Sequence, residues 1–145
     1  MSYNPLIEIK TESDEDILYC EFSSPNTNIE GELFKTIGSM VKQGLAFYQK
    51  GSRYDCYPAF LSVPKVNDSV KDLLLPIAER IVACDSAACA ARFHYKRTKN
   101  DEDPKEHEEW KERLERIEQR NSAGLAAIKA YSSDDGLIIK VWGTL

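Results

Sequence analysis

The chain has 145 residues, a length that suits one domain with a single hydrophobic core. Hydrophobic residues make up 42% and charged residues 30%, which excludes a wholly disordered, collagen-like or low-complexity chain. No run of about eighteen apolar residues occurs, so we expect no membrane-spanning helix, and Met1–Pro5 lacks the pattern of a secretory signal.

The formal net charge of −5 is unevenly distributed. Residues 1–32 hold eight acids and one base, whereas residues 35–99 hold eleven bases and five acids. The pattern fits solvated faces, or surfaces of opposite sign that meet within the fold or between copies. The densest basic group falls where a long helix should end, which cations favour, with DNA contact as the alternative: Arg92, His94, Lys96, Arg97 and Lys99.

The first thirty residues are predicted to be extended. Apolar and charged residues partly alternate over residues 6–10, and residues 17–22 form a short apolar run. Between them, residues 11–16 are an acidic turn or the first turn of a short helix.

A first helix is expected from about Glu30 to Lys50, because apolar residues recur there at three- and four-residue steps, and Gly51 would stop it. Residues 51–67 then form a connection rich in aromatic residues and proline. It is either a packed crossover or an interaction loop.

A second helix should start near Asp68 or Ser69 and keep its apolar stripe to Tyr95, with a kink or restart at Pro76. A third helix has the clearest start, since Asp103, Pro104 and Glu106 fit the N-cap, N1 and N3 positions of a capping box. Residues 121–124 are the weak point of this helix.

The last nine residues predict a β-strand, because they are apolar and rich in β-formers. A terminal strand needs a sheet edge, which its own N-terminal strands or a neighbouring molecule would supply. The expected fold is therefore mainly α: a small bundle of about three long helices with extended or β ends. One domain over 1–145 is expected, made of an extended acidic region (1–30), the bundle (31–131) and a β-prone tail (132–145).

The sequence predicts no catalytic, cofactor-binding or metal-binding residue, and we expect the protein not to be an enzyme. Nucleotide-binding, hydrolase and metalloprotease motifs are absent, and neither the four cysteines nor the two histidines have zinc spacing. A Cys–His pair assembled from distant segments is the remaining enzymatic alternative.

Residues 34–131 carry a pattern of packing positions with a recognisable order. A helix with an apolar stripe leads into Arg53-Tyr54 and a proline-bearing loop; a long helix, a polar loop and a charged helix with an early aromatic follow. The matching pieces are Ile37–Tyr48, Arg53-Tyr54, Val63-Pro64, Leu74–Ala83 and Glu108–Ile117. This pattern resembles the head–tail connector (adaptor, or head-completion) proteins of tailed bacteriophages, except that an acidic extended stretch replaces the family's opening helix.

The resemblance implies a structural virion protein of the phage neck, made in the host bacterial cytoplasm. Its ring, often of twelve copies, would join the portal protein to the next neck or tail protein and extend the DNA channel. The C-terminal segment would reach toward the portal. The candidate interface residues are Tyr54, Tyr57, Phe60, Leu137, Ile138, Ile139, Val141, Trp142 and Leu145. The alternative is a soluble helical partner-binding or regulatory domain that uses loop 53–60.

Overall fold

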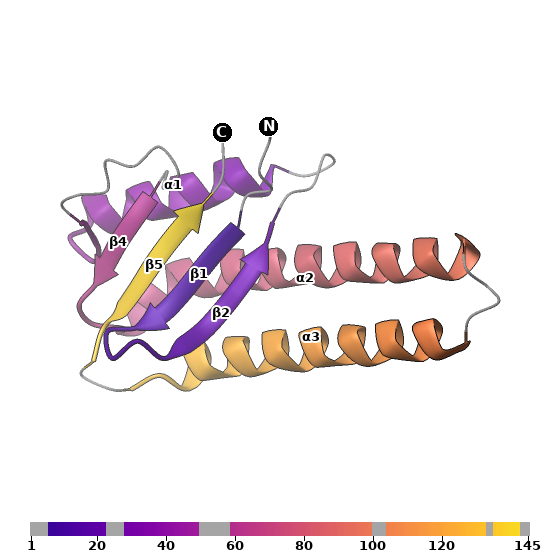
Figure 1. Ribbon diagram of the computed structural model, residues 1–145. Helices are drawn as coiled ribbons and strands as arrows, with labels where there is room; N and C mark the ends of the chain where they lie inside the picture. The colour runs from indigo at the N-terminus through magenta and orange to yellow at the C-terminus, as the bar shows by residue number, and fades with distance from the viewer. Residues whose placement is uncertain (1–5, 23–27, 50–58, 100–103, 133–134, 143–145) are drawn as a thin grey trace.

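The computed structural model describes residues 6–22, 28–49, 59–99, 104–132 and 135–142. Figure 1 shows a sheet with helices behind it and a pair of long helices that extends past the sheet on one side. The described elements, in chain order, are β1 (Leu6–Thr11), β2 (Asp16–Glu21), α1 (Ile29–Lys42), β3 (Phe47–Tyr48), β4 (Ala59–Val63), α2 (Asp68–Lys99), α3 (Pro104–Ala130) and β5 (Leu137–Trp142).

The five strands form one antiparallel sheet in the order β2-β1-β5-β4-β3. The C-terminal strand β5 is the central strand, paired with β1 from Leu6↔Trp142 to Thr11↔Leu137 and with β4 on its other side. The C-terminal strand therefore pairs with strands of its own chain and not with those of a neighbouring molecule.

The expectation of a mainly helical bundle is wrong, since the fold is mixed α/β. Part of the error lies in residues 31–131, which contain β3 and β4 as well as the helices. Strand β4 alternates buried and partly buried residues, as a strand with one face on the core should. Its residues belonged to the segment that we expected to be a connection.

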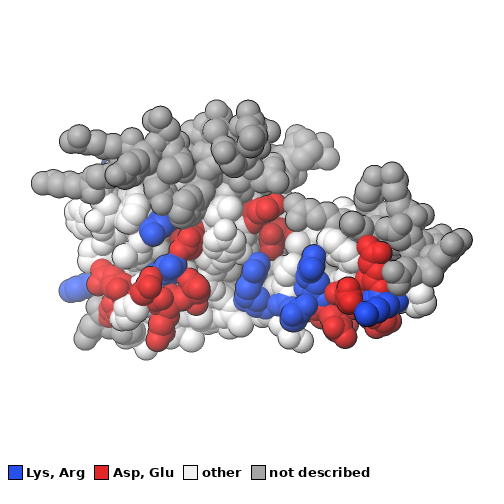
Figure 2. Space-filling model, viewed as in Figure 1, with Lys and Arg blue, Asp and Glu red and all other residues white. Residues whose placement is uncertain are grey.

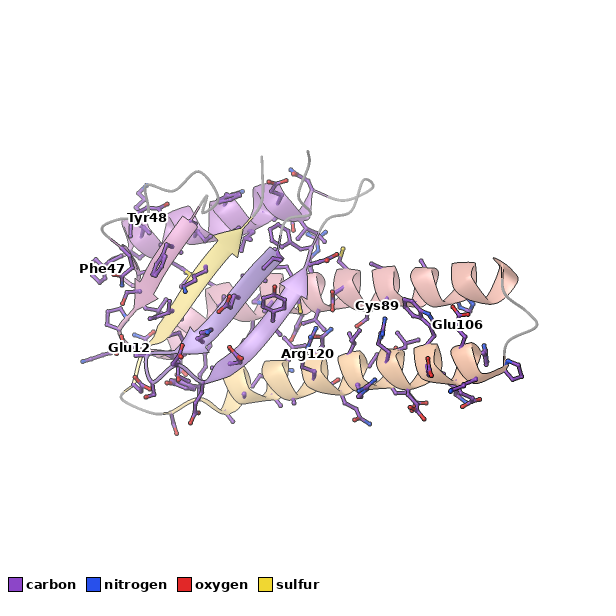
Figure 3. All side chains as sticks on the ribbon, viewed as in Figure 1. Glu12, Phe47, Tyr48, Cys89, Glu106 and Arg120 are labelled. Carbon is purple, nitrogen blue, oxygen red and sulfur yellow. The ribbon has the colours of Figure 1, made fainter. Side chains whose placement is uncertain are left out.

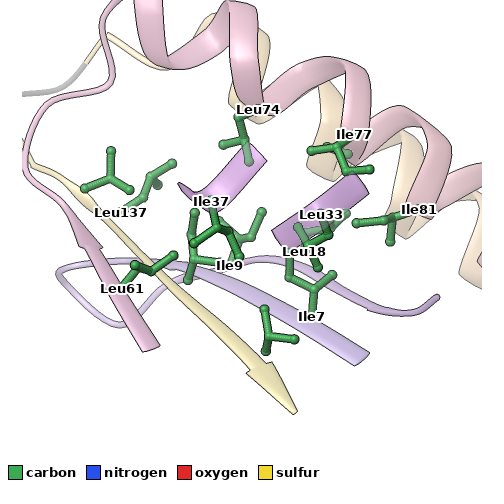
Figure 4. Close-up of a cluster of buried hydrophobic side chains, with 14 of the residues drawn as sticks. Ile7, Ile9, Leu18, Leu33, Ile37, Leu61, Leu74, Ile77, Ile81 and Leu137 are labelled. Atoms are coloured by element: carbon green, nitrogen blue, oxygen red, sulfur yellow. The ribbon is translucent and has the colours of Figure 1, made fainter. Parts of the chain in front are cut away.

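The core lies between the inner face of the sheet and the helices (Figure 4). Alternate residues of the strands point toward it because successive side chains of a strand lie on opposite faces. The helices contribute their apolar stripes. The most deeply buried members include Ile7, Ile9, Leu61, Leu137 and Ile139 from strands and Leu33, Ile37, Leu74 and Ile81 from helices.

Helix α1 ends earlier than expected, at Lys42, and the residue that stops it is Gly44 rather than Gly51. Gly44 has a φ of 73°, which glycine adopts without the steric cost that other residues meet. Its N–H donates to the Val41 carbonyl at 3.0 Å and the Leu45 N–H donates to the Met40 carbonyl at 2.9 Å. These two bonds form a Schellman motif.

The other two helices begin where the sequence places them. Helix α2 starts at Asp68, and its N-cap is Asn67, whose Oδ1 accepts from the Val70 N–H at 3.0 Å. The helix continues through Pro76 without a restart. Helix α3 starts at Pro104; the predicted cap Asp103 lies outside the described residues.

Residues 121–124, the expected weak point of α3, are where this helix contacts the sheet. The helix is continuous from Pro104 to Ala130, and Asn121 and Gly124 are buried against β2. A Cβ atom at Gly124 would lie 2.4 Å from the Ile17 carbonyl oxygen and 2.9 Å from Leu18 Cδ1. Only glycine therefore permits this approach of helix to strand.

We expect Gly124→Ala to lower the free energy of unfolding by about 2 kcal/mol, because helix and strand must separate and the overpacking outweighs the gain in helix propensity. Gly38→Ala is the matched control: a Cβ at that exposed position of α1 meets no heavy atom within 4 Å among the described residues. It should stabilise the protein by about 0.5 kcal/mol. Urea unfolding of both variants checks the opposite signs.

Candidate functional site

The predicted interface residues of the C-terminal strand divide between the two faces of the sheet. Leu137, Ile139 and Val141 are at most 1% exposed and belong to the core, so they are not available to a partner. Ile138 and Phe60 are partly buried, and their strand positions place them on the outer face. Trp142 pairs with Leu6 in the sheet. Tyr54, Tyr57 and Leu145 lie outside the described residues.

The outer face of the sheet mixes aromatic and charged side chains in cross-strand rows. One row runs from Phe60 through Lys140 and Glu8 to Tyr19, since these residues are directly opposed on neighbouring strands. The Lys140 ammonium lies 5.1 Å from the Phe60 ring centroid, within the range of a cation–π contact. At the β2 end of the row, 48% of Tyr19 is exposed.

At the other end of the sheet, the short strand β3 presents two exposed aromatic side chains. Phe47 is 54% and Tyr48 is 56% exposed, and Figure 3 shows both at the edge of the sheet. Such an edge with apolar side chains is a place where another chain can add.

The opposite edge, β2, is covered by α3 and by polar side chains that occupy its outward backbone groups. Arg120 donates to the Tyr19 carbonyl oxygen at 2.9 Å, and the Asp85 carboxylate of α2 accepts from the Glu21 N–H at 3.3 Å. Figure 3 shows Arg120 between α3 and the sheet. These contacts close the edge of β2 to further strands.

Asp85 is the centre of this polar cluster. It is 7% exposed, accepts from the buried Asn121 Nδ2 at 2.8 Å and lies 3.7 Å from the Arg120 guanidinium. The carboxylate thus has three donors or positive groups around it, as a buried charge requires. The cluster ties β2, α2 and α3 together, which is a structural role.

Cys20 belongs to the same cluster, with its Sγ 3.3 Å from Asn121 Oδ1. Burial, reinforced by the Asp85 carboxylate, raises the pKa of the Cys20 thiol from 9.0 to about 12. A raised thiol pKa means that the folded state holds its proton more tightly. Its contribution to stability is therefore complete below about pH 9 and is lost as the pH rises toward 12.

Cys20 should accordingly resist alkylation in the folded protein near pH 9, because the thiolate is the reactive form and burial suppresses it. Mass spectrometry after iodoacetamide treatment would show Cys20 unmodified while the partly exposed Cys84 reacts. In urea both should react at similar rates. Equal rates in the folded state would contradict the burial of Cys20.

The turn between β1 and β2 is strongly acidic. Residues 12–16, which we call the acidic turn, are exposed, and the side chains of Asp14 and Asp16 are 85% and 78% exposed. Lys10, on the strand before the turn, places its Nζ 3.1 Å from Glu8 Oε1 and 3.2 Å from Asp14 Oδ1. These hydrogen bonds raise the pKa of Lys10, and the bond to Glu8 has the larger effect.

Three arginines of α3 line a hollow of about 410 Å³, which we call the arginine hollow: Arg113, Arg116 and Arg120, together with Ile117. Steps of three and four residues place them on one side of the helix. In Figure 2, blue side chains gather over the part of α3 nearer the sheet, red and blue ones are mixed over its far part, and red ones gather over the β1–β2 turn on the same face of the molecule. The signal in the sequence for the hollow is the common spacing of Arg113, Arg116 and Arg120 at steps of three and four residues.

Among the described residues, no group of three or more metal-ligating side chains comes together. No helix in the described part of the chain is long and apolar enough to cross a membrane. Comparison with protein-family models, with curated proteins and with solved structures gave no match.

Proposed function

We propose that the protein is a structural subunit of a phage neck, which assembles with copies of itself into a ring between the portal and the next neck or tail protein. The observation that carries the proposal is the presence of two exposed surfaces of opposite charge on one chain, the acidic turn and the arginine hollow. Complementary surfaces of this kind set the partner and register of an interface.

The order of elements also supports this proposal. Helix α1, the connection to β4, the long helix α2 and the charged helix α3 follow one another as the resemblance to connector proteins implies. The five-stranded sheet is an addition to that pattern, and it removes the buried residues of the C-terminal strand, Leu137, Ile139 and Val141, from the contacts. Contacts to the portal would therefore come from the sheet's outer face, the β3 edge and the α2–α3 pair.

The exposed aromatic pair Phe47 and Tyr48 favours a second candidate, a partner-binding domain that acts without forming a ring. An exposed edge strand accepts an extended segment by β-augmentation. In that case the protein would be monomeric and would bind its partner through β3.

Mass photometry and negative-stain images would test the first proposal, with the purified chain alone and after mixing with the portal protein encoded nearest to its gene. We expect ring-shaped particles and co-migration with the portal. A chain that remains monomeric and passes the portal without binding would refute the proposal. Binding by a monomer, abolished by Phe47→Ser, would favour the second candidate instead.

A further inference from the structure

The arginine hollow gathers guanidinium N–H donors that a carboxylate can accept from. The Arg113 guanidinium lies 4.8 Å from the Trp110 ring centroid, and Arg120 is fixed by its bond to the Tyr19 carbonyl. Each guanidinium has five N–H donors in a planar fork, so one or two contacts leave donors for a ligand. Arginine held in this way favours bidentate contacts with planar anions.

The surroundings favour separate carboxylates over the continuous phosphate backbone of a nucleic acid. Helix α3 carries six bases and six glutamates, so its own charge sums to zero. A phosphate polymer would have to pass those glutamates, and the whole chain has a net charge of −5. A short acidic segment can reach the hollow without that repulsion.

The acidic turn is such a segment, and its shape is already fixed. The Thr11 N–H donates to the Glu15 carbonyl at 2.9 Å, and the Asp14 N–H donates to the Thr11 carbonyl at 3.0 Å. The Ser13 hydroxyl donates to Asp135 Oδ2 at 2.5 Å. Because the turn is ordered before it binds, little conformational entropy is lost in the contact.

The turn remains at its own end of the sheet, since the Glu12 N–H donates to the Gly136 carbonyl at 3.0 Å. Figure 2 shows the red group of the turn apart from the blue group over α3. We infer that the arginine hollow of one copy binds the acidic turn of a second copy. This contact rests on the proposed function, because it is one of the contacts through which copies would assemble.

Two charge-reversed chains test the contact. Chain one carries Arg113→Glu and Arg116→Glu, which spares Arg120 and its bond to β2. Chain two carries Glu12→Lys and Glu15→Lys, which spares Asp14 and Asp16 beside Lys10. Each chain alone should associate about 100-fold more weakly than wild type, at about tenfold per reversed charge, whereas an equimolar mixture should regain association.

Sedimentation velocity measures the association, and circular dichroism confirms that each variant is folded. The matched controls are Lys111→Glu on α3, outside the hollow, and Asp72→Lys on α2, outside the turn; both should assemble as wild type does. Added salt should weaken the wild-type contact, since exposed charges are screened.

The outcomes separate the contact from the proposed function. If wild type forms rings and both charge-reversed variants still form them, the contact is overturned and the ring proposal stands. Failure of wild type to associate at all would overturn both. A third outcome is that chain one loses association while chain two keeps it, and that wild type binds duplex DNA while chain one does not. This outcome would assign the hollow to phosphates and overturn the inference.

Discussion

Deletion of residues 137–145 is expected to unfold the protein. Strand β5 lies at the centre of the sheet, and its loss separates β1 from β4. It also removes the buried side chains of Leu137, Ile139 and Val141, whose burial is worth about 2 kcal/mol each. The sum is comparable with the whole stability of a domain, about 5–15 kcal/mol. Far-UV circular dichroism and thermal unfolding measure the effect.

Point substitutions on the two faces of β5 separate its core role from a surface role. Ile139→Ala should cost about 3 kcal/mol, because a core side chain is replaced by a cavity. Lys140→Ala, one position along on the outer face, should cost under about 1 kcal/mol. If the truncated protein kept its helicity and cooperative unfolding, the central place of β5 in the sheet would be contradicted. The strand would then serve to bind another molecule.

Asp85→Ala should destabilise the protein by about 3 kcal/mol. The change removes the acceptor that the Asn121 amide, the Glu21 N–H and the Arg120 guanidinium share. Asn121 is buried, and a buried polar group that loses its partner is costly. Urea unfolding followed by fluorescence provides the measurement.

Two further variants show whether the cluster is responsible. Asp85→Asn keeps an acceptor oxygen and should cost about 1 kcal/mol. Asp72→Ala, an exposed acid on the same helix, should change stability by less than about 0.5 kcal/mol. Equal effects at positions 72 and 85 would mean that the cluster does not hold β2 to the helices.

The helix starts were predictable because their signals are local. Pro104 at the first position of α3 and the polar residues Asp68 and Ser69 at the start of α2 act within one turn of chain. The end of α1 was misplaced because apolar residues continue at helical steps to Tyr48, beyond the true stop at Gly44. Phe47 and Tyr48 form β3, a two-residue strand that no periodic pattern can reveal.

The sheet was not predictable as a whole, because its order depends on pairing between segments far apart in the sequence. The sequence indicated strands at both ends of the chain, yet it did not show that β4 would complete the sheet beside β5. Pro58 and Pro64 flank residues 59–63, and prolines at both ends of so short a segment favour a connection over a strand. The sequence therefore predicts a helical class of fold.

The polar cluster and the arginine hollow were missed for a different reason. Asn121 and Gly124 stand in the apolar stripe of α3, where they resemble defects of a helix. In the structure Gly124 lets the helix approach β2, and Asn121 donates a hydrogen bond to Asp85. A polar and a small residue within an apolar stripe are thus a signal of close packing on a sheet edge.

The mass of the full-length chain in solution, measured by sedimentation equilibrium over a wide range of concentrations, tests the central claim most directly. Self-assembly through complementary surfaces predicts a closed oligomer that dissociates as salt is added. A single species with the mass of one chain, at every concentration and at low salt, would contradict it.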